Sequence, residues 1–282
     1  MPRTIPQPFT LCSLSQVTIE DEASFRHVGL YADLKDVLRR ANYRFRILPA
    51  QLAGRWDRAL LLNLTYWGAE AGGDVLVDRS IPADVVAHAA WHHLAQQALQ
   101  DGGPPCPAAL FLGESIASAF DVYLIGRLLA QTPDSSFLQT QIPAMSDAAA
   151  EAGVDEADFD ALLQYIGQHP ERAFAELREL LFDAPLALLH SPSMEDALSA
   201  LSAFDSHRFA PILHHYELSN WVLYARAYAR SITSTTSRAM DLDRALRAAP
   251  DALQLLTDAW VLPALGKAAA HAWSQPGAAM KG

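Results

Sequence analysis

The chain has 282 residues, of which 51% are hydrophobic and 19% are charged, and its formal net charge is −11. This composition excludes a disordered chain, and the excess of acidic side chains argues against nucleic acid or a membrane as a partner. Two cysteines, Cys12 and Cys106, are too few for a disulfide framework or a cysteine-based metal site. We therefore expect a globular cytoplasmic protein without a signal peptide or a membrane-spanning segment.

The first 80 residues mix helix and strand signals. An amphipathic pattern over 31–43 predicts a helix with Leu34, Val37 and Leu38 facing inward. The apolar runs 44–48 and 59–67 are typical of strands. A Gly-Gly turn signal at 72–73 precedes another short β-type run at 74–78.

Two long apolar helices are predicted next. Ser80-Ile81-Pro82 is a helix-start signal, with a hydroxyl cap and an early proline. The segment 85–100 contains no Asp, Glu, Lys or Arg, so we expect this helix to be buried on most sides. Glycines and prolines at 102–105 end it, and the second helix is predicted at about 108–131.

The rest of the chain predicts helices at 156–168, 171–182, 194–204, 208–232, 241–248 and 251–273. The segment 132–145, with Pro133 and Pro143, is the best candidate for a boundary. The predicted fold class is α+β and predominantly α-helical. A mixed α/β region with a small N-terminal sheet occupies residues 1–131, and a helical region occupies residues 132–282.

The strongest chemical signal lies in the two apolar helices. The first carries His88-Ala89-Ala90-Trp91-His92, and the second carries Gly113-Glu114-Ser115-Ile116-Ala117-Ser118. Histidines four residues apart lie one turn from each other on one helix face. A carboxylate from the next helix, Glu114, would complete a His₂Glu set of the kind that holds catalytic zinc. The alternative is a purely structural cluster of hydrogen-bonded core residues.

Two further residues belong to this predicted site. Asp121 lies two turns after Glu114, near the same helix face, and can accept a hydrogen bond from a ligating imidazole. His93 stands directly beside His92 and adds a third imidazole to the group. Three histidines together in an uncharged helix are harder to explain as core residues than one would be.

The order of these elements resembles the gluzincin clan of zinc metallopeptidases, whose pattern is HExxH followed by a third ligand, Glu, about 20 residues on. Here 21 residues, 93–113, separate His92 from Glu114. The resemblance covers about residues 60–129. It implies that His88, His92 and Glu114 are metal ligands. It also implies that the strand at 74–78 is an edge along which a peptide could lie.

Two positions depart from the clan pattern. Ala89 stands where the clan carries the glutamate that acts as general base, so peptide hydrolysis would lose about 10²–10⁴ in rate. Ser118 stands four residues after the third ligand, where the clan often has an acidic residue, and a hydroxyl orients an imidazole less firmly. The resemblance is therefore to a degenerate member of the clan.

A second group of residues lies in the predicted helix 208–232. One stripe of this helix contains His214, Glu217, Trp221, Tyr224 and Tyr228. An aromatic stripe at helical spacing is typical of a core. If the helix crosses the first site instead, the candidate catalytic residues on the wall opposite the metal are His215, Tyr216 and Glu217.

These observations leave four functions open. The first is a metal-dependent enzyme with one divalent ion, Zn or Fe, and a small-molecule or peptide substrate. The second is a non-haem Fe(II) enzyme that activates O₂, since two His and one carboxylate also describe such sites and no general base is needed. The third is an inactive pseudo-peptidase that binds a partner. The fourth is a helical protein in which these residues are structural. The sequence does not indicate the oligomeric state.

Overall fold

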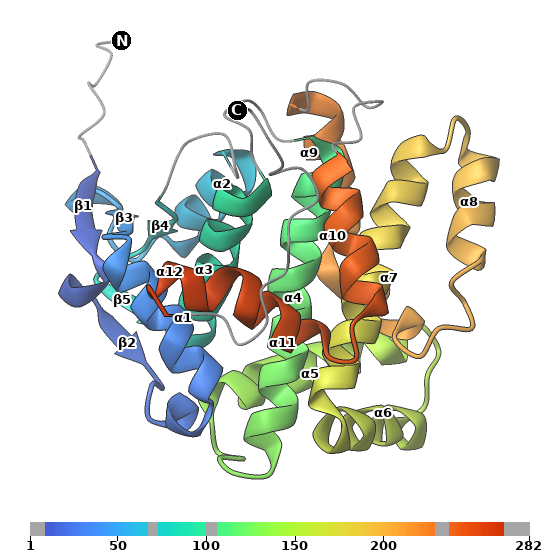
Figure 1. The fold of residues 1–282 in the computed structure, drawn as a ribbon, viewed down its shortest axis with the longest axis horizontal. Coiled ribbons are helices and arrows are strands. Elements are labelled where there is room, and N and C mark those ends of the chain that lie inside the picture. The colour runs from blue at the N-terminus through green and yellow to red at the C-terminus, as the bar shows by residue number, and fades with distance from the viewer. Residues whose placement is uncertain (1–8, 67–72, 100–105, 229–236, 268–282) are drawn as a thin grey trace, which may run out of the picture.

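Helices make up most of the molecule, and the strands gather at one side of it (Figure 1). The structure, a computed structural model, describes residues 9–66, 73–99, 106–228 and 237–267. The predicted fold class, α+β and mostly helical with a small N-terminal sheet, is confirmed. The division into two regions at residue 131 stays a prediction.

The strands are β1 (Thr10–Ser13), β2 (Thr18–Glu20), β3 (Arg44–Ile47), β4 (Val75–Leu76) and β5 (Ser80–Pro82). The α-helices are α1 (Gly29–Arg40), α2 (Trp56–Tyr66), α3 (Ala83–Leu99), α4 (Pro107–Leu129), α5 (Ser136–Glu151), α6 (Glu156–Gln168), α7 (Pro170–His190), α8 (Met194–Ser202), α9 (Leu218–Tyr228), α10 (Ser237–Ala248), α11 (Ala252–Leu256) and α12 (Leu262–Ala264). Short 3₁₀ segments are η1 (Leu14–Gln16), η2 (Ser24–His27), η3 (Ala50–Leu52) and η4 (Ala210–Tyr216), and η5 (Thr257–Val261) is a π-helical turn.

The strands form two small sheets. In the first, β1 pairs antiparallel with β3, and β3 pairs parallel with β4 through Arg46↔Val75 and Ile47↔Leu76. In the second, β2 pairs parallel with β5. The first sheet turns Phe45 and Ile47 toward the main core. Its other face packs Val75 against α2 in a separate small cluster.

Two local predictions were wrong. The run 59–67, predicted as a strand, lies mostly in α2, because its leucines are strong helix formers and a short apolar run does not distinguish the two states. The Ser80-Ile81-Pro82 signal does not cap a helix: it is strand β5, where the Ser80 hydroxyl hydrogen-bonds Glu20, and α3 begins only at Ala83. Pairing of this segment with β2 therefore outweighed the local helix-start signal.

One later helix prediction is corrected, and the proposed boundary stays a prediction. Most of the proposed boundary segment 132–145 belongs to α5, which carries Pro143 within the helix. The predicted helix 251–273 is interrupted by the π-helical turn η5, and α12 ends at Ala264. The part of that prediction beyond residue 267 lies outside the described residues.

Helix α4 is the centre of the fold. It packs against α3 on one side and against α7 on the other. Small residues let α3 and α4 approach closely: a Cβ atom added to Gly113 would lie 3.3 Å from the Cβ atom of Ala95. Among the described residues, α4 alone is long and apolar enough to cross a membrane, but 89% of its most apolar window is buried inside the protein. This burial is typical of a core helix.

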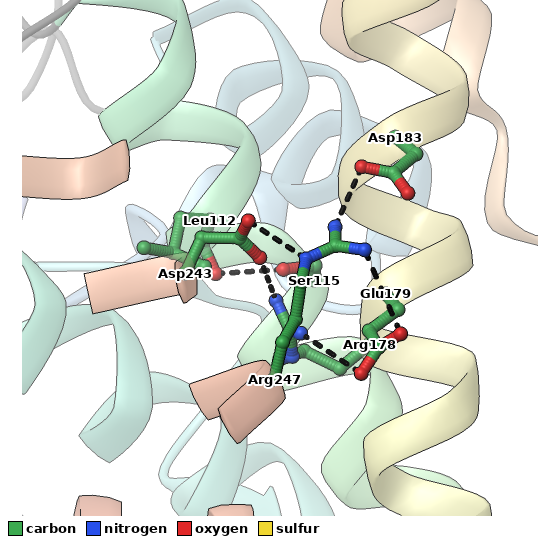
Figure 2. Close-up of polar contacts among 7 residues, drawn as sticks. All are labelled: Leu112, Ser115, Arg178, Glu179, Asp183, Asp243 and Arg247. Atoms are coloured by element: carbon green, nitrogen blue, oxygen red, sulfur yellow. Dashed lines mark hydrogen bonds and ion pairs between the residues drawn. The ribbon is translucent and has the colours of Figure 1, made fainter. Parts of the chain in front are cut away.

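A buried charged network ties α10 to α7, on the side of α4 away from the sheets (Figure 2). Arg178 is 0% exposed, and its Nη1 atom donates to Asp243 Oδ1 at 2.6 Å. Asp243 also accepts from Arg247 Nε at 2.8 Å, and Arg247 reaches Asp183 on α7 at 2.6 Å. Burial lowers the pKa of Arg178, although the Asp243 carboxylate opposes that shift. The guanidinium is therefore compensated mainly by one carboxylate.

We expect Asp243→Ala to lower the free energy of unfolding by about 3–5 kcal/mol, because it leaves the Arg178 charge buried without its counter-ion. Urea denaturation at neutral pH measures this change. The matched control is Asp241→Ala on the same helix, whose carboxylate pairs with the exposed Arg244 and contributes less than about 1 kcal/mol. Equal losses for the two variants would contradict the assigned role of the buried pair.

Asp21 joins the N-terminal strands to the helical body. Its backbone is left-handed, with φ at 53°, a conformation that Asp tolerates better than most residues. Its Oδ2 atom accepts hydrogen bonds from Ser135 Oγ at 2.6 Å and from the backbone N–H of Ser136, at the start of α5, at 2.8 Å. Burial raises the pKa of Asp21, but the hydrogen bonds from these serines and from Ser24 outweigh it and lower the pKa.

We expect Asp21→Asn to cost about 1–2 kcal/mol of stability at pH 7, since the ionised carboxylate caps α5. The pKa is lower in the folded state than in the unfolded state. The contribution is therefore complete above the unfolded value near 3.8 and is lost as pH falls through the folded pKa. Urea denaturation of both proteins between neutral and acidic pH checks this. A stability difference that persisted unchanged at the acid end would show that the carboxylate charge is not involved.

Candidate metal site

The two histidines of α3 and the glutamate of α4 come together as predicted. The imidazole centroids of His88 and His92 are 4.8 Å apart, as expected one helical turn from each other. The potential ligand atoms of His88, His92 and Glu114 all lie within 4.8 Å of one another. Among the described residues, this is the one group of three His, Cys, Asp or Glu side chains with such spacing.

The close packing of α3 and α4 produces this arrangement. Gly113 precedes Glu114 in the chain, and its contact with Ala95 fixes the separation of the two helices beside the site. Glu114 is 5% exposed, whereas about a third of each imidazole is exposed, 33% for His88 and 30% for His92. The carboxylate therefore forms the floor of the site and the imidazoles form its rim.

The donor set and its spacing fit a divalent ion. Ligand atoms about 2.0–2.1 Å from a tetrahedral zinc ion lie about 3.3 Å from one another. The Nε2 atom of His92 is 3.2 Å from Oε1 of Glu114, so this pair already has the required separation. An imidazole nitrogen that faces a buried carboxylate oxygen at this distance needs a proton or a cation between the two atoms.

Asp121 lies behind His88. Its Oδ2 atom is 3.5 Å from His88 Nδ1, which leaves Nε2 as the ring nitrogen for a ligand. Burial alone would lower the pKa of His88, but the Asp121 carboxylate and the charges of Glu114 and Asp74 raise it to about 9. For His92, burial and the positive charge of His88 lower the pKa well below its ordinary value. Without a metal, His88 thus carries a proton at neutral pH and His92 is neutral.

Two carboxylates near His88 were not among the predicted site residues. Burial raises the pKa of Asp74, opposed by the charge of His88 and a hydrogen bond from Tyr43 at 3.3 Å. Burial and the charge of Asp121 raise the pKa of Asp84 to about 6. Asp84 could have been found from the sequence, because Asp84, His88 and His92 follow one another at intervals of four on α3. Asp74 could not, since it approaches His88 only through the sheet.

The second predicted constellation is only partly assembled. The expected helix 208–232 is broken: η4 ends at Tyr216, Glu217 is left-handed with φ at 49°, and α9 starts at Leu218. His214 and Glu217 therefore share no helical stripe with Trp221 and Tyr224, which are buried in the core. The side chain of Tyr228 lies outside the described part of the chain.

Of the three candidate catalytic residues, two lie near the site. Burial raises the pKa of Tyr216, and the charge of Asp121 raises it further. Burial and His214 lower the pKa of His215, while Asp121 opposes this shift. Both side chains are therefore close enough to Asp121 to experience its charge. Glu217, by contrast, is exposed and accepts a hydrogen bond from Asn220 at 2.7 Å.

The remaining predicted residues lie beside the three-residue group. His93 is 2.9 Å from the side-chain amide of Gln97, and its ring meets that of Tyr43 edge-on, so it faces away from the ligand set. Ser118 is buried on α4, one turn after Glu114. Ala89, at the general-base position of the gluzincin pattern, is 2% exposed and part of the core. It has no group that can take a proton.

The edge of β4 is closed at one residue. On its outer side, Val75 donates its N–H to Asn63 Oδ1 at 2.7 Å, and its carbonyl accepts from Asn63 Nδ2 at 3.1 Å. The carboxamide on α2 thus occupies both backbone positions that an added peptide strand would use at Val75.

Comparisons with protein-family models, with curated proteins and with solved structures found no match to this chain. The gluzincin resemblance therefore rests on the residues of the site and on the order of the elements around them.

We expect Asp121→Asn to lower the pKa of His88 by about one pH unit or more in the metal-free protein, because the substitution removes the charge beside Nδ1. NMR titration of the imidazole, assigned with His88→Gln, measures the effect. The control is Asp78→Asn, which alters an exposed carboxylate after β4. A His88 titration that is the same in wild type and Asp121→Asn would contradict the pairing.

Proposed function

We propose that this protein is a metal-dependent enzyme on a gluzincin-like scaffold, with one divalent ion, Zn or Fe, held by His88, His92 and Glu114. The observation that carries the proposal is the convergence of two imidazoles and one buried carboxylate within 4.8 Å, between two core helices. A set of three protein ligands leaves coordination positions for a substrate, as in catalytic rather than structural sites.

The bound ion would supply a Lewis acid at the rim of the site. Asp121 accepts from His88 Nδ1 and so holds the ring in the tautomer that binds through Nε2. Glu114 contributes negative charge from the floor, where low exposure strengthens its attraction for a cation. Tyr216 and His215, which experience the charge of Asp121, are the groups available to donate to a substrate oxygen.

Two features argue against standard peptide hydrolysis. Position 89 holds a buried alanine in place of the general base. Asn63 occupies the backbone groups of Val75 that would pair with an extended peptide. Together they favour a small-molecule substrate over a peptide.

A non-haem Fe(II) enzyme that activates O₂ is the second candidate. Two imidazoles and one carboxylate with open positions is the ligand set of such enzymes, and their chemistry does not require a base at position 89. The two candidates share their ligands and differ in the reaction: the second requires Fe(II) and O₂, whereas the first uses Zn or Fe. A pseudo-peptidase would share the metal site but have no turnover.

We expect protein purified without added metal to contain about one equivalent of Zn or Fe per chain by elemental analysis. His88→Ala and the nearly isosteric Glu114→Gln should each weaken metal affinity by about a hundredfold or more, and Asp121→Asn by about tenfold. The matched control is His190→Ala, which removes an exposed imidazole at the end of α7 and should keep the affinity of the wild type.

The same measurement separates the candidates. Iron, with a spectral change on exposure to O₂, would select the oxygen-activating enzyme, and zinc would favour hydrolytic chemistry. Metal-free protein that also gains no thermal stability from added Zn²⁺ or Fe²⁺ would refute both and leave the cluster as structural.

A further inference from the structure

Helix α2 presents a row of large apolar side chains to solvent. Trp56, Leu60, Leu61 and Leu64 are 66%, 46%, 53% and 46% exposed. They follow one another at helical spacing, so they share the outward side of the helix. The inward side packs Ala59 and Leu62 into the small cluster on β4. Clustered exposure of this kind marks an interaction surface, whereas single exposed apolar residues need no explanation.

The charge of the segment that leads into α2 is opposite to that of the whole chain. The net charge of the chain is −11, yet residues 39–64 contain six arginines and a single acid, Asp57. Arg55 and Arg58 flank the exposed tryptophan at the start of α2, and both approach Asp57, at 2.6 Å and 3.7 Å. One carboxylate thus offsets two guanidinium groups, and this end of the helix keeps a positive charge.

Exposed apolar side chains next to arginines distinguish α2 from α8, which also carries an exposed apolar pair. On α8, Met194 and Leu198 are 83% and 67% exposed, but they lie beside Glu195 and Asp196 and no basic residue shares that helix. A second copy of the chain is also a poor match for α2, because this helix carries no acid other than Asp57 to meet the arginines of the other copy.

We propose that α2 docks the protein onto an anionic phospholipid surface. The leucines enter the acyl boundary, the Trp56 ring lies at headgroup level, and Arg55 and Arg58 meet the lipid phosphates. This surface does not depend on the metal site. The proposal differs from the expectation of no membrane partner, which was drawn from the charge of the whole chain and stays untested.

The test is co-sedimentation of the full chain with two kinds of vesicle, phosphatidylcholine alone and phosphatidylcholine mixed with phosphatidylserine. We expect binding to the mixed vesicles that weakens as salt is added, and little binding to the neutral ones. The double variant Leu60→Ser and Leu61→Ser should bind the mixed vesicles about tenfold more weakly or worse.

The matched control is Met194→Ser with Leu198→Ser, which removes an equally exposed apolar pair and should bind like the wild type. Because the replaced leucines are about half exposed, a thermal melt should show that the first variant stays folded. Equal binding to both kinds of vesicle, or unchanged binding of the Leu60/Leu61 variant, would overturn the proposal. So would a dimer in solution that the Leu60/Leu61 variant disperses, since a second copy would then cover α2.

Discussion

The close contact between α3 and α4 is the constraint on which the site depends. Only small residues permit it, Ala95 on one helix and Gly113 on the other. Glu114 follows that glycine directly, so the same packing that closes the core also carries a carboxylate to His92. A larger residue at position 113 would separate the helices and move the acid away from both imidazoles. Core packing and ligand geometry are thus one feature of this protein.

Charged side chains have different roles at two places in the molecule. On the far side of α4, Arg178 is buried and directly compensated by Asp243, which stabilises the docking of α10. At the candidate metal site, four carboxylates lie near two imidazoles that remain partly open to solvent. Carboxylates beside partly exposed imidazoles can balance the charge of a bound cation, whereas the Arg178–Asp243 pair joins two helices.

Helix α2 contacts strand β4 on one side and carries the proposed lipid surface on the other. Its inward Asn63 closes the edge of β4 at Val75, and its outward leucines remain in solvent. The amino-acid composition of the chain predicts neither the contact of Asn63 with Val75 nor the exposure of these leucines. The same eleven-residue helix, Trp56–Tyr66, can serve both because its two sides differ: one satisfies backbone groups of a strand, and the other offers apolar area beside arginines.

The sequence by itself determined the long helices and the ligands on them. Intervals of four residues on an uncharged helix place His88 and His92 on one face whatever the surroundings, because helix geometry is local. The tertiary structure decided the rest. A short apolar run did not show whether residues 59–66 form helix or strand, and apolar spacing did not reveal the left-handed break at Glu217 within 208–232. The approach of Asp74 to His88 and of Asn63 to Val75 likewise required the sheet to form, since contacts between separate elements arise only when the chain packs.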